Sequence, residues 1–469
     1  MTDSFYFTIA ETIEKFRRKE ISPVELINEH LGRAHRLQPS LNAFVHLDCE
    51  SAIARARQAE SAMARGEKLP PLHGIPLTVK SCIDVAGWPC PAGSLLRKDY
   101  VPSANAPLVS RLEDSGAILL GNTNTPEFLM AYETDNRLNG KTPNPWNIAY
   151  SAGGSSGGEA AAIASGISMG GVGSDGGGSI RTPAHFCGIC GLKPTPGRIP
   201  STGHFPPPGG AFSWLGVVGP MARTVADLRI LFEVMAGPDD GDPFSVPVPL
   251  QTENTKVRQG MRVGILQSPA LGTATPETQA AVDRAGKLLA ARGFHVEVFS
   301  LGKLDDALRL WWFFFGDVIG LELRQSTKGQ KSLLSPMLRE FLEITAAETP
   351  VTLESFLNAC VERDAVRTGI LRQMREVPIL LSPVSSAPAF RHGAGNYRTG
   401  DAHNYRDTMR FCQWLNLAGF PGLSLPFGLS PEGLPINIQL IGRPYEEELL
   451  LQVGQLLENE RGPWQAPPL

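Results

Sequence analysis

The chain has 469 residues, a formal net charge of −4 at pH 7 and a hydrophobic fraction of 42%. This charge offers no basic excess for a phosphate backbone, so nucleic acid is not expected as a partner. The seven cysteines are odd in number and scattered, which argues against a disulfide framework and for a reducing compartment. At about 150 residues per domain, the length suggests roughly three domains, and it is ample for a large core.

Targeting and membrane segments are not expected. The first 20 residues carry Asp3, Glu11, Glu14 and Glu20 and lack the apolar stretch of a signal peptide. No apolar run reaches the roughly 18 residues that a membrane helix needs, and the aromatic cluster at 310–315 is far too short. We therefore expect a cytoplasmic protein without a membrane span.

In chain order, the first predicted elements are helices, over residues 8–65. A capping box with a first-turn proline marks one helix start at residues 22–25. Residues 75–85 are apolar and β-branched and predict a buried strand with Lys80 inside it. The expected elements that follow are a helix over 108–116, a strand over 117–120 and a helix start at 125–127.

The rest of the chain alternates strands and helices. Residues 151–210 are rich in glycine, and residues 237–250 form a Pro/Asp-rich linker. Strands are predicted over 262–266, 295–299, 378–384, 422–426 and 436–441. Helices are predicted over 276–292, through most of 303–376, and over 445–460. This alternation predicts an α/β fold with a largely buried mixed sheet.

The glycine-rich block is the first candidate for a site. It holds 17 of the 49 glycines within residues 151–210, and 11 of these lie within 151–178, where there is no Lys or Arg. Backbone amides without side chains can approach a ligand closely. A phosphate cradle is disfavoured because the block lacks the GxxxxGK[ST] motif and a GxGxxG between strand and helix. An oxyanion-type site is favoured, with hydroxyls among free N–H groups.

Two serine clusters lie within this block. Ser156 matches GxSxG, a weak signal because a nucleophile elbow needs a preceding strand and residues 147–151 are a poor strand. Ser179 follows three glycines and precedes Thr182-Pro183, which we interpret as a helix cap and first turn. A single glycine-flanked serine is usually only a tight turn, but two such sites 24 residues apart favour chemistry.

A nucleophilic serine needs a base. His185 is near in sequence, although a histidine at a helix start is more often a packing or capping residue. Lys80 is the other candidate, although a lone strand lysine commonly reaches out to water. If it is buried, desolvation lowers its pKa and leaves a neutral amine able to accept a proton.

Lys80, the GGSSGGE run at 153–159 and the GGGSIRTP run at 176–183 together resemble the amidase signature family. The match extends through FCGICGLKPT at 186–195, GPMARTVAD at 219–227 and PINIQLIG at 435–442. Its motifs look most like the fatty-acid amide hydrolase branch, without that branch's membrane helix. The resemblance implies a large mixed β-sheet core covered by α-helices on both faces.

The resemblance also implies a Ser–cis-Ser–Lys triad. Ser179 would be the nucleophile, Ser155, after a cis bond from Gly154, the proton relay, and Lys80 the general base. The backbone N–H groups of Gly176, Gly177, Gly178 and Ser179 would form the oxyanion hole. Ser156 and a buried Asp175–Arg181 pair would support it. No metal or cofactor is implied.

The substrate side is less determined. The segment 128–132 matches the family stretch that lines the acyl site, so Leu129 and Met130 are candidate substrate contacts. Trp311, in the aromatic run 311–315, is either a core residue or a wall of the substrate funnel. Cys187 and Cys190 could form half of a zinc or redox site, but two small buried residues are the simpler interpretation.

These observations predict one amidase domain over residues 1–469, because the expected strands span the chain. It would comprise an N-terminal helical segment (1–70), a catalytic core (71–236), a variable helical, substrate-side region (251–376) and C-terminal strands and helix (377–469). The expected activity is hydrolysis of a carboxamide, anilide or related carbamate, acting on a small molecule. Alternatives are a glutaminase-type subunit of an amidotransferase complex and a non-catalytic binding protein. A homodimer is common in the family.

Overall fold

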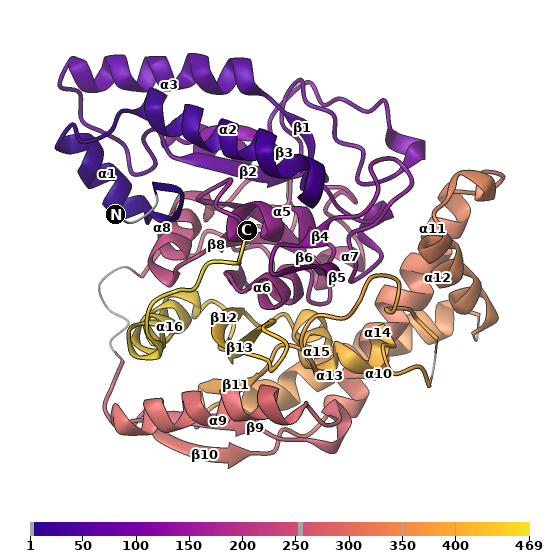
Figure 1. Cartoon of the computed structure of the whole chain (residues 1–469). Coiled ribbons are helices and arrows are strands. Elements are labelled where there is room, and N and C mark those ends of the chain that lie inside the picture. The colour runs from indigo at the N-terminus through magenta and orange to yellow at the C-terminus, as the bar shows by residue number, and fades with distance from the viewer. Residues whose placement is uncertain (1–3, 252–256, 349, 399) are drawn as a thin grey trace.

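One mixed sheet of eleven strands runs through the computed structural model, which describes residues 4–251, 257–348, 350–398 and 400–469 (Figure 1). Its strands lie in the order β1-β3-β2-β6-β8-β7-β12-β13-β11-β9-β10, and β4 and β5 form a separate pair. The strands are β1 Phe44–Leu47, β2 Pro76–Lys80, β3 Ile118–Thr123, β4 Pro143–Asn144, β5 Asn147–Ser151, β6 Gly170–Asp175, β7 Cys190–Lys193, β8 Val217–Ala222, β9 Arg262–Leu266, β10 His295–Phe299, β11 Ile379–Pro383, β12 Gly422–Leu429 and β13 Pro435–Ile441.

Parallel and antiparallel pairs both occur in this sheet. β2 lies parallel to β3 and β6, and β9 lies parallel to β10 and β11. The other neighbouring pairs are antiparallel. The prediction of an α/β fold with a large mixed sheet is confirmed.

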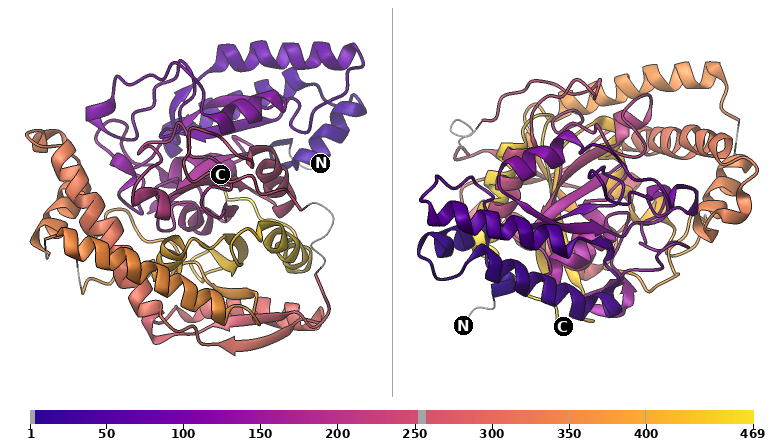
Figure 2. Two further views of the ribbon diagram at one scale, coloured as in Figure 1. Left: turned by 180° about the vertical axis from the view of Figure 1, so that it is seen from behind. Right: turned by 90° about the horizontal axis from the view of Figure 1, so that it is seen from above.

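Helices cover both faces of the sheet (Figures 1 and 2). α4, α8, α9 and α16 contribute to the largest apolar core on one face, and α5 and α6 pack on the other. The helices are α1 Ile9–Arg17, α2 Pro23–Leu41, α3 Cys49–Ala64, α4 Pro107–Asp114, α5 Gly157–Ala164, α6 Arg181–Cys187, α7 Phe212–Leu215, α8 Val225–Met235, α9 Pro276–Ala291, α10 Leu304–Trp312, α11 Ile319–Ser326, α12 Pro336–Ala347, α13 Leu353–Gln373, α14 Tyr405–Thr408, α15 Arg410–Ala418 and α16 Glu447–Arg461.

Alternation along β2 decides where Lys80 points. Successive side chains of a strand face opposite sides of the sheet. Leu77 and Val79 belong to the large apolar core, whereas Thr78 donates a hydrogen bond to Glu159 of α5. Lys80, at the end of β2, therefore lies on the α5 side, where the glycine-rich block folds.

Several predicted boundaries were wrong. The 8–65 stretch is interrupted by β1, a short edge strand that pairs with β3. The strand predicted over 75–85 ends at Lys80, and the helix start at Thr125 leads only to a 3₁₀ turn, Glu127–Leu129. Residues 147–151, judged a poor strand, form β5, whose pairing with β4 needs no amphipathic pattern. The β9–α9–β10 unit and the last helix were predicted correctly apart from end residues.

The prediction of mainly helical structure over 303–376 is confirmed by α10 to α13, with a 3₁₀ turn, Lys331–Leu333, between α11 and α12. A π-helical segment, Phe313–Val318, joins α10 to α11. α11 and α12 project from the body of the molecule as an arm (Figures 1 and 2). Across the described part of the chain, no helix is long and apolar enough to cross a membrane.

Candidate active site

The glycine-rich block folds around the middle of the sheet. β6 lies between β2 and β8 and ends at Asp175, and a short loop carries the chain through Ser179 into α6. α6 has Ile180 as its N-cap, so Thr182 and Pro183 lie inside its first turn, and the prediction of Thr182 as the cap was wrong. α5 begins directly after Ser156.

Lys80 and Ser155 meet in the interior. The Lys80 Nζ lies 2.6 Å from Ser155 Oγ and 3.0 Å from Ser174 Oγ. Lys80 is fully buried, and Ser155 and Ser174 are nearly so. The alternative of an edge-strand lysine reaching out to solvent is therefore wrong, because β2 has a neighbour on each side.

Burial lowers the pKa of Lys80 to about 8, because the ammonium form loses its hydration. Cys82, Asp175 and Glu159 act in the opposite direction, each favouring the charged form. An amine with this pKa is partly neutral at pH 7–8, and only the neutral form can accept a proton from Ser155.

Close backbone approach fixes the segment that carries Ser155. The Gly154–Ser155 peptide bond is cis. A Cβ at Gly154 would lie 2.7 Å from the Ala131 carbonyl oxygen, so only glycine fits there. The Thr125 hydroxyl donates to the carbonyl oxygen of Ser155 at 2.7 Å. The serine that touches Lys80 is thus held by the close main chain of Ala131 on one side and by the Thr125 hydroxyl on the other.

Ser179 opens into the pocket that Ser155 also lines. It is half-buried, and no hydrogen bond to its hydroxyl is found within residues 4–251, 257–348, 350–398 and 400–469. The amide N–H of Ser156 donates to the Ser179 carbonyl oxygen at 3.2 Å. The Ser156 hydroxyl meets the main chain of Ser174 at 3.3 Å, so this serine braces the two segments and does not line the pocket.

The loop before Ser179 supplies fewer free amides than the sequence suggested. The N–H of Gly178 donates to Asp175 Oδ1 at 2.7 Å, so Gly178 is not an oxyanion donor, contrary to expectation. For the amides of Gly176, Gly177 and Ser179, the described residues provide no acceptor. These three N–H groups remain as the candidates.

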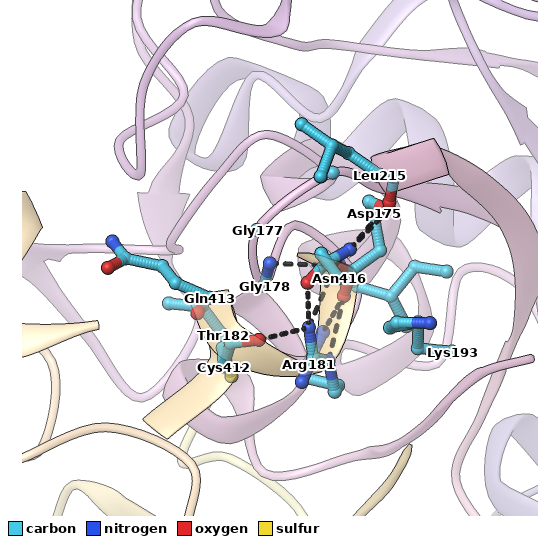
Figure 3. A network of polar contacts seen from close by, with 12 residues as sticks. Asp175, Gly177, Gly178, Arg181, Thr182, Lys193, Leu215, Cys412, Gln413 and Asn416 are labelled. Atoms are coloured by element: carbon cyan, nitrogen blue, oxygen red, sulfur yellow. Dashed lines mark hydrogen bonds and ion pairs between the residues drawn. The ribbon is translucent and has the colours of Figure 1, made fainter. Parts of the chain in front are cut away.

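A buried ion pair fixes that loop, and Figure 3 shows the network around it. Arg181 Nε and Nη2 each lie 3.0 Å from an oxygen of Asp175, which also accepts the N–H of Ile180 at 3.1 Å. Burial alone would raise the pKa of the Asp175 carboxyl, but the Arg181 guanidinium holds it well below its usual range. Asp175 thus stays ionised while it orients the loop.

His185 is excluded as the base by its contacts. Its Nδ1 accepts the N–H of Asn437 at 2.7 Å, and its Nε2 lies 3.1 Å from the Ala387 carbonyl oxygen. Both ring nitrogens are therefore occupied, and the ring is buried outside the pocket lining. Burial lowers the pKa of His185 to about 4.

The pocket in front of Ser179 is mainly apolar, with a volume of about 260 Å³. Leu129 and Met130 line it as expected, together with Phe128, Phe205 and Phe315. Trp311 does not line it and is corrected: its indole stacks on Phe315 and its Nε1 donates to the Gly176 carbonyl oxygen at 3.0 Å. Within the aromatic run at 311–315, Phe315 thus lines the pocket, and Trp311 holds the loop at Gly176 by a hydrogen bond.

The sequence did not reveal several residues of the site. Ser174, a second partner of Lys80, could have been suspected from its place on β6, beside β2. Asn416 donates to both Asp175 Oδ1 and the Asp175 carbonyl oxygen at 3.0 Å from 241 residues away, and no local signal indicates it. The Tyr132 hydroxyl donates to the Gly177 carbonyl oxygen at 2.5 Å.

The cysteines do not gather into a metal site. Cys187 and Cys190 are buried and free, and each thiol faces a main-chain carbonyl. No cluster of three or more potential metal ligands occurs within the described ranges. The interpretation of the pair as two small buried residues agrees with these contacts.

A family model described as Amidase matches residues 25–451. The chain belongs to the amidase family. It is accordingly an enzyme that hydrolyses carbon–nitrogen bonds of amides, and the alternative of a non-catalytic binding protein is set aside. The resemblance to the amidase signature family is confirmed.

Named relatives of this amidase cover almost its whole length. The A-type subunit of the glutamyl-tRNA(Gln) amidotransferase of Synechococcus sp. (strain CC9605) is 34% identical, over 96% of each chain. A solved chain from a vestigial protein complex, described as revealing the origins of an s-triazine catabolic enzyme, is 30% identical with a TM-score of 0.90, covering 98% of this chain and 100% of that one. A bacterial aryl acylamidase of the amidase signature family is 26% identical with a TM-score of 0.86, over 98% and 97%. A fatty acid amide hydrolase, 24% identical with a TM-score of 0.85 over 98% and 86%, shares the fold.

Proposed function

We propose that this amidase is a serine hydrolase of apolar carboxamides, anilides or related carbamates, and that it works through an acyl-enzyme on Ser179. The observation that carries the proposal is the contact of Lys80 with Ser155, which lines the same pocket as the Ser179 hydroxyl. A nucleophile, a relay hydroxyl and a desolvated amine then lie along one route for a proton.

In the proposed reaction, Ser179 Oγ attacks the amide carbonyl as its proton passes to Ser155, whose own proton passes to neutral Lys80. The developing oxyanion is stabilised by the amides of Gly176, Gly177 and Ser179. Lys80 then returns the proton through Ser155 to the leaving amine, and the carbon–nitrogen bond breaks. Water attacks the acyl-enzyme by the same proton route and releases the acid.

The pocket walls favour an uncharged apolar acyl group. Phe128, Phe205 and Phe315 dominate the lining, and no lysine or arginine lines it within the described residues. Of its two carboxylates, Asp175 is paired with Arg181, and Glu322 stands at the arm. The bacterial aryl acylamidase among the relatives supports anilides as the first substrates to test.

A glutaminase-type subunit is the second candidate, because curated relatives at 32–35% identity are named as subunits of glutamyl-tRNA(Gln) amidotransferases. Glutamine carries an α-carboxylate, which an amidase would ordinarily pair with a guanidinium or ammonium group. The apolar pocket, which has Glu322 and no basic side chain among its described lining residues, is unsuited to that carboxylate. We therefore place this candidate second.

The test uses the purified chain alone, assayed with p-nitroacetanilide and with glutamine. We expect release of p-nitroaniline and little hydrolysis of glutamine. Ser179→Ala and Lys80→Ala should each abolish turnover, whereas His185→Ala and the pocket-wall control Ser326→Ala should retain most of it. Loss of activity in His185→Ala with an active Lys80→Ala would contradict the proposed roles. Hydrolysis of glutamine alone would favour the second candidate.

A further inference from the structure

One wall of the pocket in front of Ser179 comes from the arm of α11 and α12 (Figures 1 and 2). Ile319 and Leu323 of α11 line this wall. Phe128 and Leu129 of the 3₁₀ turn line the pocket from the catalytic core. The space available to a substrate therefore depends on how the arm is held against this turn.

Glu127, the first residue of the turn, connects the turn to the arm. Its Oε1 accepts the Ser94 hydroxyl at 2.7 Å, and its Oε2 accepts the backbone N–H of Ser335 at 2.5 Å, from 208 residues away. All three residues are buried. Ser335 is the N-cap of α12, so the carboxylate also lies at the positive end of that helix dipole. One side chain thus holds the start of α12 against the turn that lines the pocket.

The turn itself has a strained backbone. Phe128 has φ +50° and Leu129 has φ +68°, a region that residues other than glycine rarely adopt. The N–H of Phe128 donates to the Ala92 carbonyl oxygen at 2.9 Å. Strain of this kind persists only where surrounding contacts determine the conformation. Glu127 supplies two such contacts, so its removal should release the turn and the arm together.

The other polar contacts of this part of the arm lie at the surface. Arg137 of the core is exposed and donates to carbonyl oxygens of the loop before α12, among them that of Leu334 at 3.4 Å. Lys331 pairs with Glu343 at 2.7 Å within the arm, and both side chains are exposed. Water competes for groups at the surface, whereas the buried hydrogen bonds of Glu127 have no such competitor. Glu127 is therefore the stronger connection.

We propose that Glu127 is a positioning residue that determines acyl-chain selectivity, because it holds α11 at a fixed distance from Phe128 and Leu129. The inference rests on the proposed hydrolysis at Ser179 and names the group bound beyond it, an apolar acyl chain long enough to reach α11. An acetyl group ends beside Ser179 and does not reach the arm. Loss of Glu127 therefore raises KM for long acyl groups and spares kcat, since the oxyanion donors lie on a separate loop.

The experiment measures kcat and KM of the full chain for acetyl- and hexanoyl-p-nitroanilide, which share one leaving group. Glu127→Ala should raise KM for the hexanoyl substrate about fivefold, roughly the contribution of one or two buried methylene groups. Its kcat, and its KM for the acetyl substrate, should stay within about twofold of the wild type. Glu127→Gln should restore the selectivity, because its amide oxygen can accept the Ser335 N–H and its NH₂ can donate to Ser94. The control Lys331→Gln removes an ion pair within the arm and should behave as the wild type does.

A second pair of variants changes the donor and serves if Glu127→Ala does not fold. Ser335 has φ −66° and follows Leu334 in extended conformation, so the backbone accepts proline there. Ser335→Pro removes the N–H that Glu127 accepts and should raise KM for the hexanoyl substrate in the same way. Ser335→Ala keeps that N–H and should retain the wild-type selectivity. An equal rise of KM for both substrates, a change confined to kcat, or wild-type KM values in both Glu127→Ala and Ser335→Pro would overturn the proposal.

Isothermal titration calorimetry separates this inference from the proposed hydrolysis. In Ser179→Ala, which lacks the proposed nucleophile, hexanamide should bind, and adding Glu127→Ala should weaken that binding about fivefold. Hexanamide that does not bind, or that binds equally with and without Glu127→Ala, would overturn the positioning role. Binding that depends on Glu127 in a chain that hydrolyses neither anilide would support the positioning role and refute only the proposed reaction.

Discussion

The pH dependence of hydrolysis is the most direct test of Lys80 as the base. With a pKa of about 8, the neutral fraction of Lys80 is about 1% at pH 6, 10% at pH 7 and 90% at pH 9. If the neutral amine is required, kcat/KM should rise about ninetyfold from pH 6 to pH 9 and level off above pH 9. The value of kcat/KM rises with pH because the deprotonated form of Lys80 is the base.

The assay is kcat/KM for p-nitroacetanilide in buffers of constant ionic strength. Lys80→Arg is the matched variant, because a guanidinium stays protonated at every working pH, and it should be inactive throughout. A base with the pKa of His185, about 4, would instead give a flat profile over this range. A flat wild-type profile from pH 6 to pH 9, or an active Lys80→Arg, would refute the reasoning.

Three further outcomes are expected. Glu322→Lys should raise kcat/KM for succinyl-p-nitroanilide, because it replaces a negative charge on the pocket wall by a positive one that attracts the succinyl carboxylate. The increase should be only about threefold to tenfold, since residue 322 is exposed and solvent screens its charge. The acetyl substrate should be unchanged, and equal changes for both substrates would contradict a charge effect. Trp311→Phe keeps an aromatic ring but loses one hydrogen bond to the loop, so kcat measured by steady-state kinetics should fall about fivefold. The control Trp312→Phe should change kcat little. A larger loss of kcat in Trp312→Phe than in Trp311→Phe would contradict the role of Trp311 as a loop anchor. Asp175→Asn leaves the Arg181 charge buried without its partner, so the free energy of unfolding, measured in urea, should fall by about 3–5 kcal/mol. An unchanged urea midpoint would mean that the ion pair does not stabilise the fold.

Local sequence signals predicted the parts of the site that lie on single elements. The apolar, β-branched residues around Lys80 indicated a buried strand, whereas the burial of the lysine itself was left open. Ser155 and Ser179 were assigned through the resemblance to the amidase signature family, which rests on the serine motifs and their spacing. The fold class followed from the alternation of strands and helices. These predictions depend on residues that are close in sequence, where periodicity and turn chemistry are informative.

Contacts between distant segments could not be predicted in the same way. β1 was missed because a four-residue edge strand has too little periodicity to be distinguished from the helices on either side. Gly178 was assigned to the oxyanion hole because the motif does not reveal that Asp175 turns back to accept its N–H. Asn416 and Gln439 reach Arg181 from more than 200 residues away, through the packing of the C-terminal strands and α15.

The glycines of the catalytic loop serve close approach rather than flexibility. A Cβ at Gly177 would lie 2.5 Å from the Trp311 ring and 2.8 Å from the Tyr132 hydroxyl, and Gly178 has φ +129°. The same loop is held by the carboxylate of Asp175, and its carbonyls accept from Trp311 and Tyr132. A segment with so many fixed contacts has little freedom left, so its free amides stay oriented before any substrate binds. Such preorganised donors need no rearrangement during the reaction. The loop consists of glycines because the surrounding side chains leave no room for a Cβ.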